Sequence, residues 1–327
     1  MALNTDGATR MTQTAVTPEL PPRMALTVGP VLYHWTRDAL MQFYAEIADS
    51  TADAVVIGEA VCARRRELRL EDWLSLGREL ATAGKEVVLA AQALIETEAD
   101  LRLLERQGAQ LEFAVEAGDA STLQLLAGRV PLVLGHHLNI YSRQALKEHA
   151  DLGVRHWVAP VELALDAMAR INPPQDRVCR PDGAPLSTEA WAFGRMPLAL
   201  SARCVTARHH RVPKDDCGFR CLADEDGLLL SSTEDKPFLV LNGTQTQSAT
   251  VHSLLGDATA LRAAGVSRLR LSPCAHGFAQ VLADFEAVMN AGESDAGRGS
   301  RWIAAGVPGP LSNGYARRLP GMNWSNT

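Results

Sequence analysis

Short apolar runs alternate with amphipathic segments along residues 24–290. The apolar runs, which we predict to be strands, cover residues 24–29, 53–58, 85–94, 110–117, 130–142, 154–160, 191–201 and 266–274. The amphipathic segments between them predict helices over residues 37–48, 70–84, 96–108, 119–129, 142–153, 161–171, 251–265 and 278–290. Because the strand runs are continuously apolar rather than alternating, they indicate a parallel sheet covered by helices on both faces.

This repetition of strand and helix predicts an α/β fold, a single (β/α)8 TIM-barrel-like domain over residues 24–290. A doubly wound open sheet is the alternative, but no Gly-x-Gly-x-x-Gly turn follows the first strand. A cysteine-rich segment, residues 199–222, forms an insertion late in the ring. Residues 1–23 predict a disordered leader, residues 172–190 an exposed Pro-rich loop, and residues 291–327 a mobile C-terminal tail.

Charge and hydropathy narrow the class of protein. The formal net charge is −6 with acidic and basic residues mixed along the chain, which argues against a nucleic-acid partner. No run approaches the roughly 20 apolar residues that cross a bilayer, and the first residues have no apolar signal core. We therefore expect a cytoplasmic protein that is not transmembrane. In that reducing compartment, clustered cysteines indicate metal ligands or redox thiols rather than disulfides.

The most distinctive chemistry lies in the segment 199–222. It holds Cys204, Cys217 and Cys221 with Cys-x12-Cys-x3-Cys spacing, three thiols in a loop short enough to close around one metal centre. A fourth ligand has to come from elsewhere. Spacing favours Cys62, just after the second strand, and Cys274, at the end of the last strand, about equally.

Two further sets of residues are weaker ligand candidates. Cys179 lies in the Pro-rich loop, and His209 and His210 follow Cys204 in a basic stretch that is equally typical of a solvated loop. Four thiolates suit either zinc or an iron–sulfur cluster. Structural zinc sites usually take two close cysteine pairs, whereas this chain has one, so the residues favour a [4Fe-4S] cluster.

Polar residues at the predicted strand ends are candidates for substrate binding. The C-terminal ends of the strands share one face of a barrel, and active sites form there. Glu59, His137, Asn139 and Arg203 lie at such ends, and a His or Asn at this position suits a substrate carboxylate or an acid/base role. No Ser/His/Asp arrangement indicates a hydrolase, and no catalytic residue stands out from the sequence.

Six motifs carry a resemblance to a known family. They are GEAVCARRRE (58–67), GHHLNIYS (135–142), AFGRMPLALSARC (192–204), KDDCGFRCL (214–222), LNGTQTQS (241–248) and LRLSPC (269–274). With them the chain, over roughly residues 24–290, resembles the ubiquinone-biosynthesis branch of the collagenase-like peptidase family U-thirty-two. The cysteine segment and the preceding GRMPLALS are the most specific part.

The resemblance implies a [4Fe-4S] cluster held by Cys62, Cys204, Cys217 and Cys221. It also implies a subunit of an oxygen-independent ubiquinone-ring hydroxylation system, paired as a heterodimer with UbiU and assisted by the lipid-binding protein UbiT. Ubiquinone precursors are the implied substrates and prephenate the implied oxygen donor, whereas peptidase activity is not what this branch implies. The alternative is a scaffold subunit whose metal only stabilises the late loop.

Overall fold

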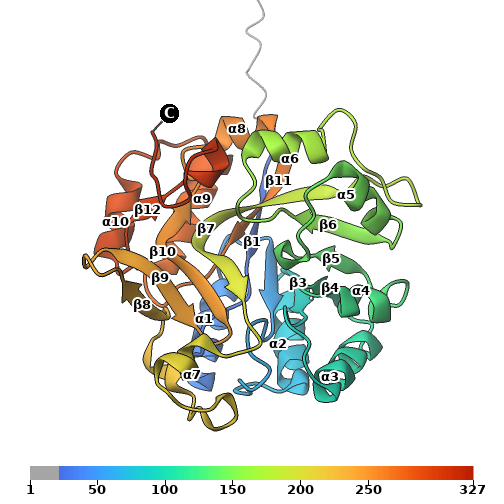
Figure 1. The fold of residues 1–327 in the computed structure, drawn as a ribbon. Helices are drawn as coiled ribbons and strands as arrows, with labels where there is room; N and C mark the ends of the chain where they lie inside the picture. The colour runs from blue at the N-terminus through green and yellow to red at the C-terminus, as the bar shows by residue number, and fades with distance from the viewer. Residues whose placement is uncertain (1–21, 327) are drawn as a thin grey trace, which may run out of the picture.

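Eight parallel strands close into a barrel at the centre of the molecule. The computed structural model describes residues 22–326. The barrel strands are β1 (Ala25–Val28), β2 (Ala54–Ile57), β3 (Glu86–Ala90), β4 (Ala114–Ala117), β5 (Leu132–Leu134), β6 (Val154–Val158), β7 (Ser187–Leu200) and β11 (Val266–Leu271). Each pairs in parallel with the next, and β11 pairs with both β7 and β1 (Figure 1). The predicted barrel is confirmed, and the alternative of an open sheet is wrong.

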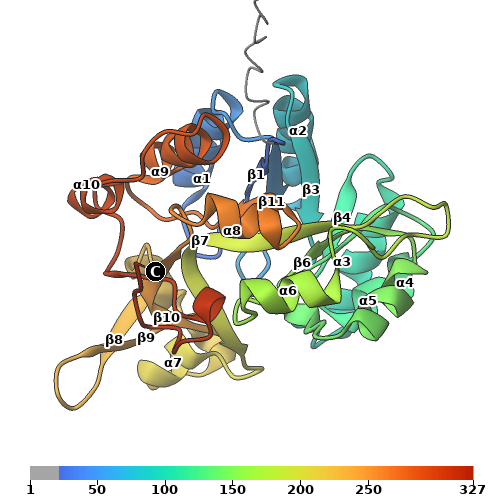
Figure 2. The same ribbon diagram turned by 90° about the horizontal axis from the view of Figure 1, so that it is seen from above.

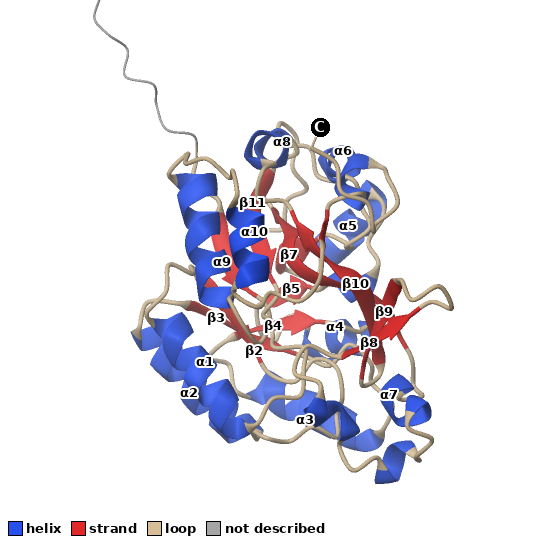
Figure 3. Cartoon of the chain, turned by 90° about the vertical axis from the view of Figure 1, so that its left-hand side faces the viewer, coloured by secondary structure: helices blue, strands red, loops and turns tan. Residues whose placement is uncertain are grey.

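Helices surround this barrel, as Figure 3 shows. They are α1 (Arg37–Ala48), α2 (Leu70–Thr82), α3 (Glu98–Ala109), α4 (Ala120–Leu126), α5 (Arg143–Ala150), α6 (Leu165–Ile171), α8 (Ala258–Ala263) and α9 (Phe278–Phe285). Helix α1 illustrates why they form: the Thr36 side chain caps its first turn, and Leu40, Phe43, Tyr44 and Ile47 recur on its buried face. Within residues 22–326 no helix is long and apolar enough to span a membrane.

The predicted insertion lies between β7 and β11. Strand β7 is 14 residues long, so it continues past the barrel and pairs there with β10 (Gln245–Ser253) in antiparallel orientation. Strands β9 (Pro237–Asn242) and β8 (Leu228–Ser231) extend this side sheet, which projects to one side of the barrel with α7 (Val205–His209) in Figure 2. The helix predicted over residues 251–265 is wrong at its start, because residues 251–253 end β10.

The barrel interior holds a buried ion triad. Arg270 of β11 donates to Glu116 of β4 (Nη2 to Oε2, 2.6 Å) and to Glu189 of β7 (Nε to Oε1, 2.5 Å). Arg270 and Glu189 are each only 1% exposed. A guanidinium with five donors can hold two carboxylates from different strands, so the triad links three strands across the barrel.

The C-terminal residues are folded onto the barrel rather than forming the mobile tail that composition predicted. They include α10 (Arg298–Ala304), β12 (Leu311–Ser312) and the short helix η5 (Tyr315–Arg317). Trp302 is fully buried, stacks on Phe285 at a ring-centroid distance of 6.0 Å, and donates from Nε1 to Asp284 at 2.8 Å. This aromatic anchor in a Gly-rich stretch explains the error.

The Pro-rich loop between α6 and β7 is shorter than predicted. The exposed loop predicted over residues 172–190 is too long, because β7 already begins at Ser187 and buried Asn172 donates to Leu186 and Thr188. The predicted leader lies outside the described residues, apart from Pro22 and Arg23.

Candidate metal centre at the barrel mouth

The four cysteines that the sequence singled out come from two distant parts of the chain. Cys62 lies in the loop after β2, and Cys204 is the N-cap of α7, just beyond β7. Cys217 follows the short helix η2 (Lys214–Asp216), and Cys221 belongs to the short helix η3 (Arg220–Ala223). All six cysteines of the chain are free thiols.

The four thiols lie within electrostatic range of one another and affect one another's pKa. Burial raises the pKa of the Cys62 thiol, and Cys221 raises it further. Burial likewise raises the pKa of Cys204, with added repulsion from Cys62 and Cys217. Burial also raises the pKa of Cys221, with added repulsion from Cys204 and Cys217. Each of the four thiols therefore interacts with at least one other member of the group.

Cys274 and Cys179 do not belong to this group. The Cys274 thiol is buried and donates to the backbone oxygen of His276 at 3.2 Å. Its pKa is raised by burial and by Asp226. Cys179 is exposed on the Pro-rich loop. Of the two candidates that spacing left equal, Cys62 contributes to the raised pKa of Cys204, whereas none of the late cysteines contributes to the raised pKa of Cys274. The role of Cys62 as the fourth ligand stays a prediction.

The turn between β9 and β10 supports Cys204. The Cys204 thiol donates to the backbone oxygen of Gly243 at 3.2 Å and accepts from the Ala207 backbone N–H at 3.4 Å. Gly243 has φ +62°, and a Cβ there would lie 2.8 Å from Nη2 of Arg65. A side chain at position 243 would be strained in this backbone conformation and would have to displace the Arg65 guanidinium.

Glu59 organises the Cys62 loop. Its Oε1 accepts from the backbone N–H groups of Val61 and Cys62, each at 2.9 Å, and lies 3.9 Å from Nη1 of Arg65. Burial raises the pKa of Glu59, whereas Arg65 and the two backbone donors lower it. These contacts give Glu59 a positioning role beside Cys62, while its predicted contact with substrate stays a prediction.

Replacing Glu59 by alanine removes the acceptor that fixes this loop. We expect amide hydrogen exchange at Val61 and Cys62 to rise by about tenfold or more, since a hydrogen bond to a charged group contributes roughly 1.5–3 kcal/mol. Glu59→Gln, which keeps the acceptor oxygen, serves as the matched control and should show a smaller change. Exchange rates in Glu59→Ala equal to those of the wild type would show that Glu59 does not hold the loop.

Arg65 and His34 lie next to the cysteines, and nothing in the sequence indicated either of them. Arg65 is 4% exposed and donates to the Leu32 backbone oxygen and to Asn242 Oδ1, both at 2.7 Å. Its charge lowers the pKa of Cys62 and of Cys221 against the effect of burial. His34 Nδ1 lies 3.6 Å from the Cys221 sulfur. In the sequence Arg65 is the middle of three consecutive arginines, and nothing in that run distinguishes it from its neighbours.

The donor set suits a cationic inorganic centre. Burial and mutual repulsion oppose thiolate formation at Cys62, Cys204 and Cys221. A bound metal centre would favour the thiolate forms instead, because coordination deprotonates a thiol. Within residues 22–326 no group of three or more His, Cys, Asp or Glu side chains is arranged around a single ion position. A four-iron cluster takes each thiolate at a different iron, so its ligands do not need to converge on one point.

The remaining predicted site residues are spread around the mouth. His137, in the short helix η1 (His136–Leu138) after β5, has Nε2 3.5 Å from Gln245 Nε2, and burial lowers its pKa to about 4. Asn139 is exposed with φ +56°, and its Oδ1 accepts from the Tyr141 hydroxyl at 3.4 Å. Arg203 is exposed. Among the described residues, no hydrogen bond or ion pair joins Glu59, His137, Asn139 and Arg203 to one another, so their role in substrate binding stays a prediction.

His209 and His210 lie exposed at the end of α7, where their rings contact each other at 5.1 Å between centroids.

A cleft of about 990 Å³ opens beside the Cys62 loop, with Glu59, Arg65 and Gln92 in its wall.

A buried histidine in β10 makes stability depend on pH. His252 is 2% exposed, and burial lowers its pKa to about 4. The unfolded chain, with a histidine pKa near 6.5, binds this proton first as the pH falls. We expect the free energy of unfolding to drop between about pH 6.5 and pH 4, by roughly 3 kcal/mol from His252, and to level off below that range.

Urea denaturation across this pH range measures the effect. His252→Gln should reduce the slope of stability against pH, with His137 contributing in the same direction in both proteins. An unchanged slope in His252→Gln would contradict the assignment.

The fold and this site together define a (β/α)8 barrel that carries a cysteine group at the C-terminal mouth. A family model described as Peptidase family U32 matches residues 40–282. The chain therefore belongs to peptidase family U32.

Solved structures resemble the chain only distantly. The U32 peptidase Mk0906 is 11% identical, with 80% of this chain and 98% of that chain covered at a TM-score of 0.42. A type I 3-dehydroquinate dehydratase from Clostridium difficile is 12% identical, with 53% and 77% covered and a TM-score of 0.36. A phospho-2-dehydro-3-deoxyheptonate aldolase from Thermotoga maritima is 13% identical, with 76% and 60% covered and a TM-score of 0.37. At these values none of the three bears on function.

Proposed function

We propose that this chain is a UbiV-like subunit of an oxygen-independent ubiquinone-ring hydroxylation system and carries a [4Fe-4S] cluster on Cys62, Cys204, Cys217 and Cys221. The observation that carries the proposal is that the Cys62 loop meets the cysteine segment: Arg64 pairs with Asp215 at 3.0 Å, and Cys62 and Cys204 affect each other electrostatically. Membership of the U32 family and the six motifs support it. UbiU is the proposed heterodimer partner, UbiT the lipid-binding partner, and prephenate the proposed oxygen donor.

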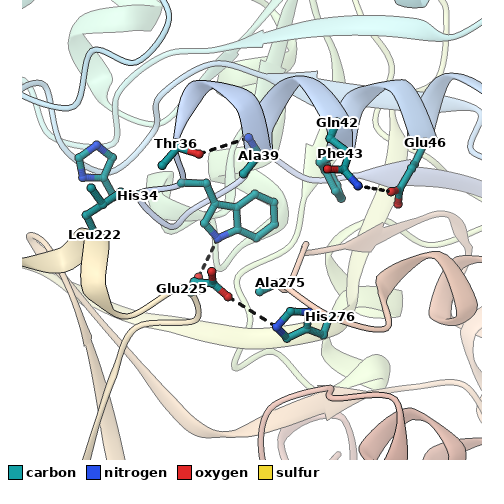
Figure 4. Close-up of a pocket in the computed structure, with 11 residues that line it drawn as sticks. His34, Thr36, Ala39, Gln42, Phe43, Glu46, Leu222, Glu225, Ala275 and His276 are labelled. Atoms are coloured by element: carbon teal, nitrogen blue, oxygen red, sulfur yellow. Dashed lines mark hydrogen bonds and ion pairs between the residues drawn. The ribbon is translucent and has the colours of Figure 1, made fainter.

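The residues around the thiols fit this role. A bound cluster supplies one-electron transfer. Arg65 places a buried positive charge beside Cys62 and Cys221, which favours their thiolate forms. His34 has its Nδ1 3.6 Å from the Cys221 sulfur and also lines the pocket beside α1 that Figure 4 shows. Glu59 holds the backbone that presents Cys62.

A scaffold role is the second candidate, and a specific contact favours it. Arg64, two residues after Cys62, pairs with Asp215, two residues before Cys217, at 3.0 Å between Nη1 and Oδ1. Shared ligation of one metal centre would join the same two segments. On this alternative the metal centre only holds the insertion against the loop after β2 and has no redox role.

Anaerobic ubiquinone synthesis separates the two candidates. In cells that depend on this chain, the double variant Cys217→Ala/Cys221→Ala is expected to abolish ubiquinone formation without oxygen, while Cys179→Ala leaves it unchanged. A double variant that loses its metal, remains folded and still sustains ubiquinone synthesis would establish the scaffold role. Proteolytic activity that survives the double variant would point instead to a metal-independent peptidase.

A further inference from the structure

The cleft beside the Cys62 loop has a lining that the proposed function does not use. It opens between the segment that leads into α2 and helix α3, with a volume of about 990 Å³. Sites for small organic ligands usually measure about 300–1,000 Å³, so this cleft lies at the upper end of their range. It has room for a ligand of nucleotide size, whereas a bare inorganic ion would fill only a small part of it.

Four arginines in the cleft wall have no carboxylate partner. Arg66 and Arg69 come from the segment before α2, and Arg102 and Arg106 come from α3. All four are exposed, and none of them forms an ion pair within residues 22–326. Arg102 and Arg106 stand four residues apart on one face of α3, where like charges repel each other. Positive charge therefore borders the cleft on both sides.

The carboxylates of the cleft do not neutralise this charge. Glu59 is committed to the Cys62 loop, and Asp100 accepts hydrogen bonds in the first turn of α3. The remaining carboxylates in the wall are those of Glu71 and Glu105. Four unpaired arginines against two unpaired glutamates leave an excess of two positive charges. A ligand with at least two negative charges complements this wall.

An organic phosphate suits the two arginine pairs better than a carboxylate does. A carboxylate has two oxygens, which a single guanidinium can occupy as a bidentate pair. A phosphate group has three acceptor oxygens and carries up to about two charges. A diphosphate presents its oxygens in several directions, so it can contact the arginines of both walls at once.

A buried amide borders the same cleft. Gln92, two residues beyond β3, lines the cleft and is only 8% exposed. Its side chain has no hydrogen-bond partner among the described residues, and an unpaired buried amide costs free energy. The wall also includes the apolar surfaces of Ile57, Leu89 and Trp73. This part of the cleft suits an uncharged ring or sugar that can hydrogen bond to the amide.

We propose that this cleft binds an organic diphosphate of nucleotide size, with the diphosphate held by arginines from both walls and the uncharged part against Gln92. The arginines are Arg66, Arg69, Arg102 and Arg106. No cysteine lines the cleft. The proposal is therefore independent of the cluster and adds a second small-molecule site to the proposed function.

Calorimetric titration with ADP, at fixed ionic strength and without added magnesium, tests this site. Arg102→Gln and Arg106→Gln should each weaken ADP binding about tenfold, because each removes charge-assisted hydrogen bonds to phosphate. Arg129→Gln, which changes an exposed arginine outside the cleft, is the matched control and should bind ADP like the wild type. Equal affinities in all three variants, or no ADP binding to the wild type, would overturn the proposal.

Three further ligands test the two parts of the site. Adenosine and citrate should each bind at least tenfold less tightly than ADP, and citrate binding as tightly as ADP would contradict the preference for phosphate. Inorganic pyrophosphate should bind less tightly than ADP. Gln92→Leu should weaken the binding of ADP but not of pyrophosphate, and equal ADP affinity in Gln92→Leu and the wild type would contradict the role of the amide.

The cysteine variant separates this site from the metal centre. Cys217→Ala/Cys221→Ala should bind ADP like the wild type although it loses its metal. ADP binding without iron in the wild type contradicts the cluster alone, and iron without ADP binding contradicts the cleft proposal alone.

Discussion

Replacing Arg270 by leucine is expected to destabilise the barrel by about 3–5 kcal/mol, which is the usual effect of removing one partner from a buried ion pair. The substitution leaves Glu116 without its cation and leaves Glu189 only Arg268, whose Nε lies 3.7 Å from Glu189 Oε2. Although burial acts to raise it, Arg270 and Arg268 hold the pKa of Glu189 below its ordinary value. Without Arg270 the two carboxyl groups must take up protons or unfold the barrel.

Urea denaturation at neutral pH measures this loss. Arg78→Ala, which breaks the exposed ion pair with Glu112, is the matched control and should leave stability unchanged within error. Arg270→Leu combined with Glu116→Leu and Glu189→Leu should recover part of the lost stability, since apolar groups then replace the whole triad. A loss below about 1 kcal/mol in Arg270→Leu would show that the triad does not stabilise the barrel.

Replacing a ligand of the proposed cluster is the second change for which we expect a large effect, the loss of bound iron. Cys62→Ala, Cys204→Ala, Cys217→Ala and Cys221→Ala are each expected to reduce bound iron to near zero after anaerobic preparation. A four-iron cluster depends on all four thiolates, and partly ligated clusters are open to solvent and oxygen. Iron and acid-labile sulfide are measured per chain, together with the visible absorbance of the sulfur-to-iron charge transfer.

The other two cysteines provide the controls. Cys179→Ala changes an exposed thiol and Cys274→Ala a buried one, and both should retain the iron content of the wild type. The Cys274 variant also controls for loss of a buried side chain near the barrel mouth. If Cys274→Ala loses iron while Cys62→Ala keeps it, the fourth ligand has been assigned to the wrong residue.

The barrel could be predicted from the sequence because its signals are local. Continuous apolar runs such as residues 53–58 and the capped amphipathic segment 37–48 each specify one element, and their repetition specifies the ring. The long β7 could not be predicted in full. Its first residues, Ser187–Ala190, follow a Pro-rich stretch, and only pairing with β6 and β11 makes them a strand.

The cysteine group illustrates where sequence reasoning stops. Spacing identified Cys204, Cys217 and Cys221 but gave equal weight to Cys62 and Cys274, since both follow barrel strands. The choice depends on where the insertion folds, and the β9–β10 turn at Gly243 places Cys204 near Arg65 and the β2 loop. Contacts of that kind join residues about 180 positions apart and leave no local pattern.

Positioning residues were missed for a related reason. His34 and Arg65 are buried polar side chains whose partners lie on other elements, and in the sequence they look like a lone histidine and a surface arginine. The C-terminal segment looks mobile in the sequence because it is rich in Gly, Ser and Arg, whereas one buried tryptophan, Trp302, anchors it in the structure.

The most direct test of the cysteine assignment is Mössbauer spectroscopy of the anaerobically prepared protein, combined with iron, sulfide and zinc counts. The account predicts about four irons and four sulfides per chain with the spectrum of a [4Fe-4S] cluster, and no stoichiometric zinc. One zinc per chain with no iron would contradict it.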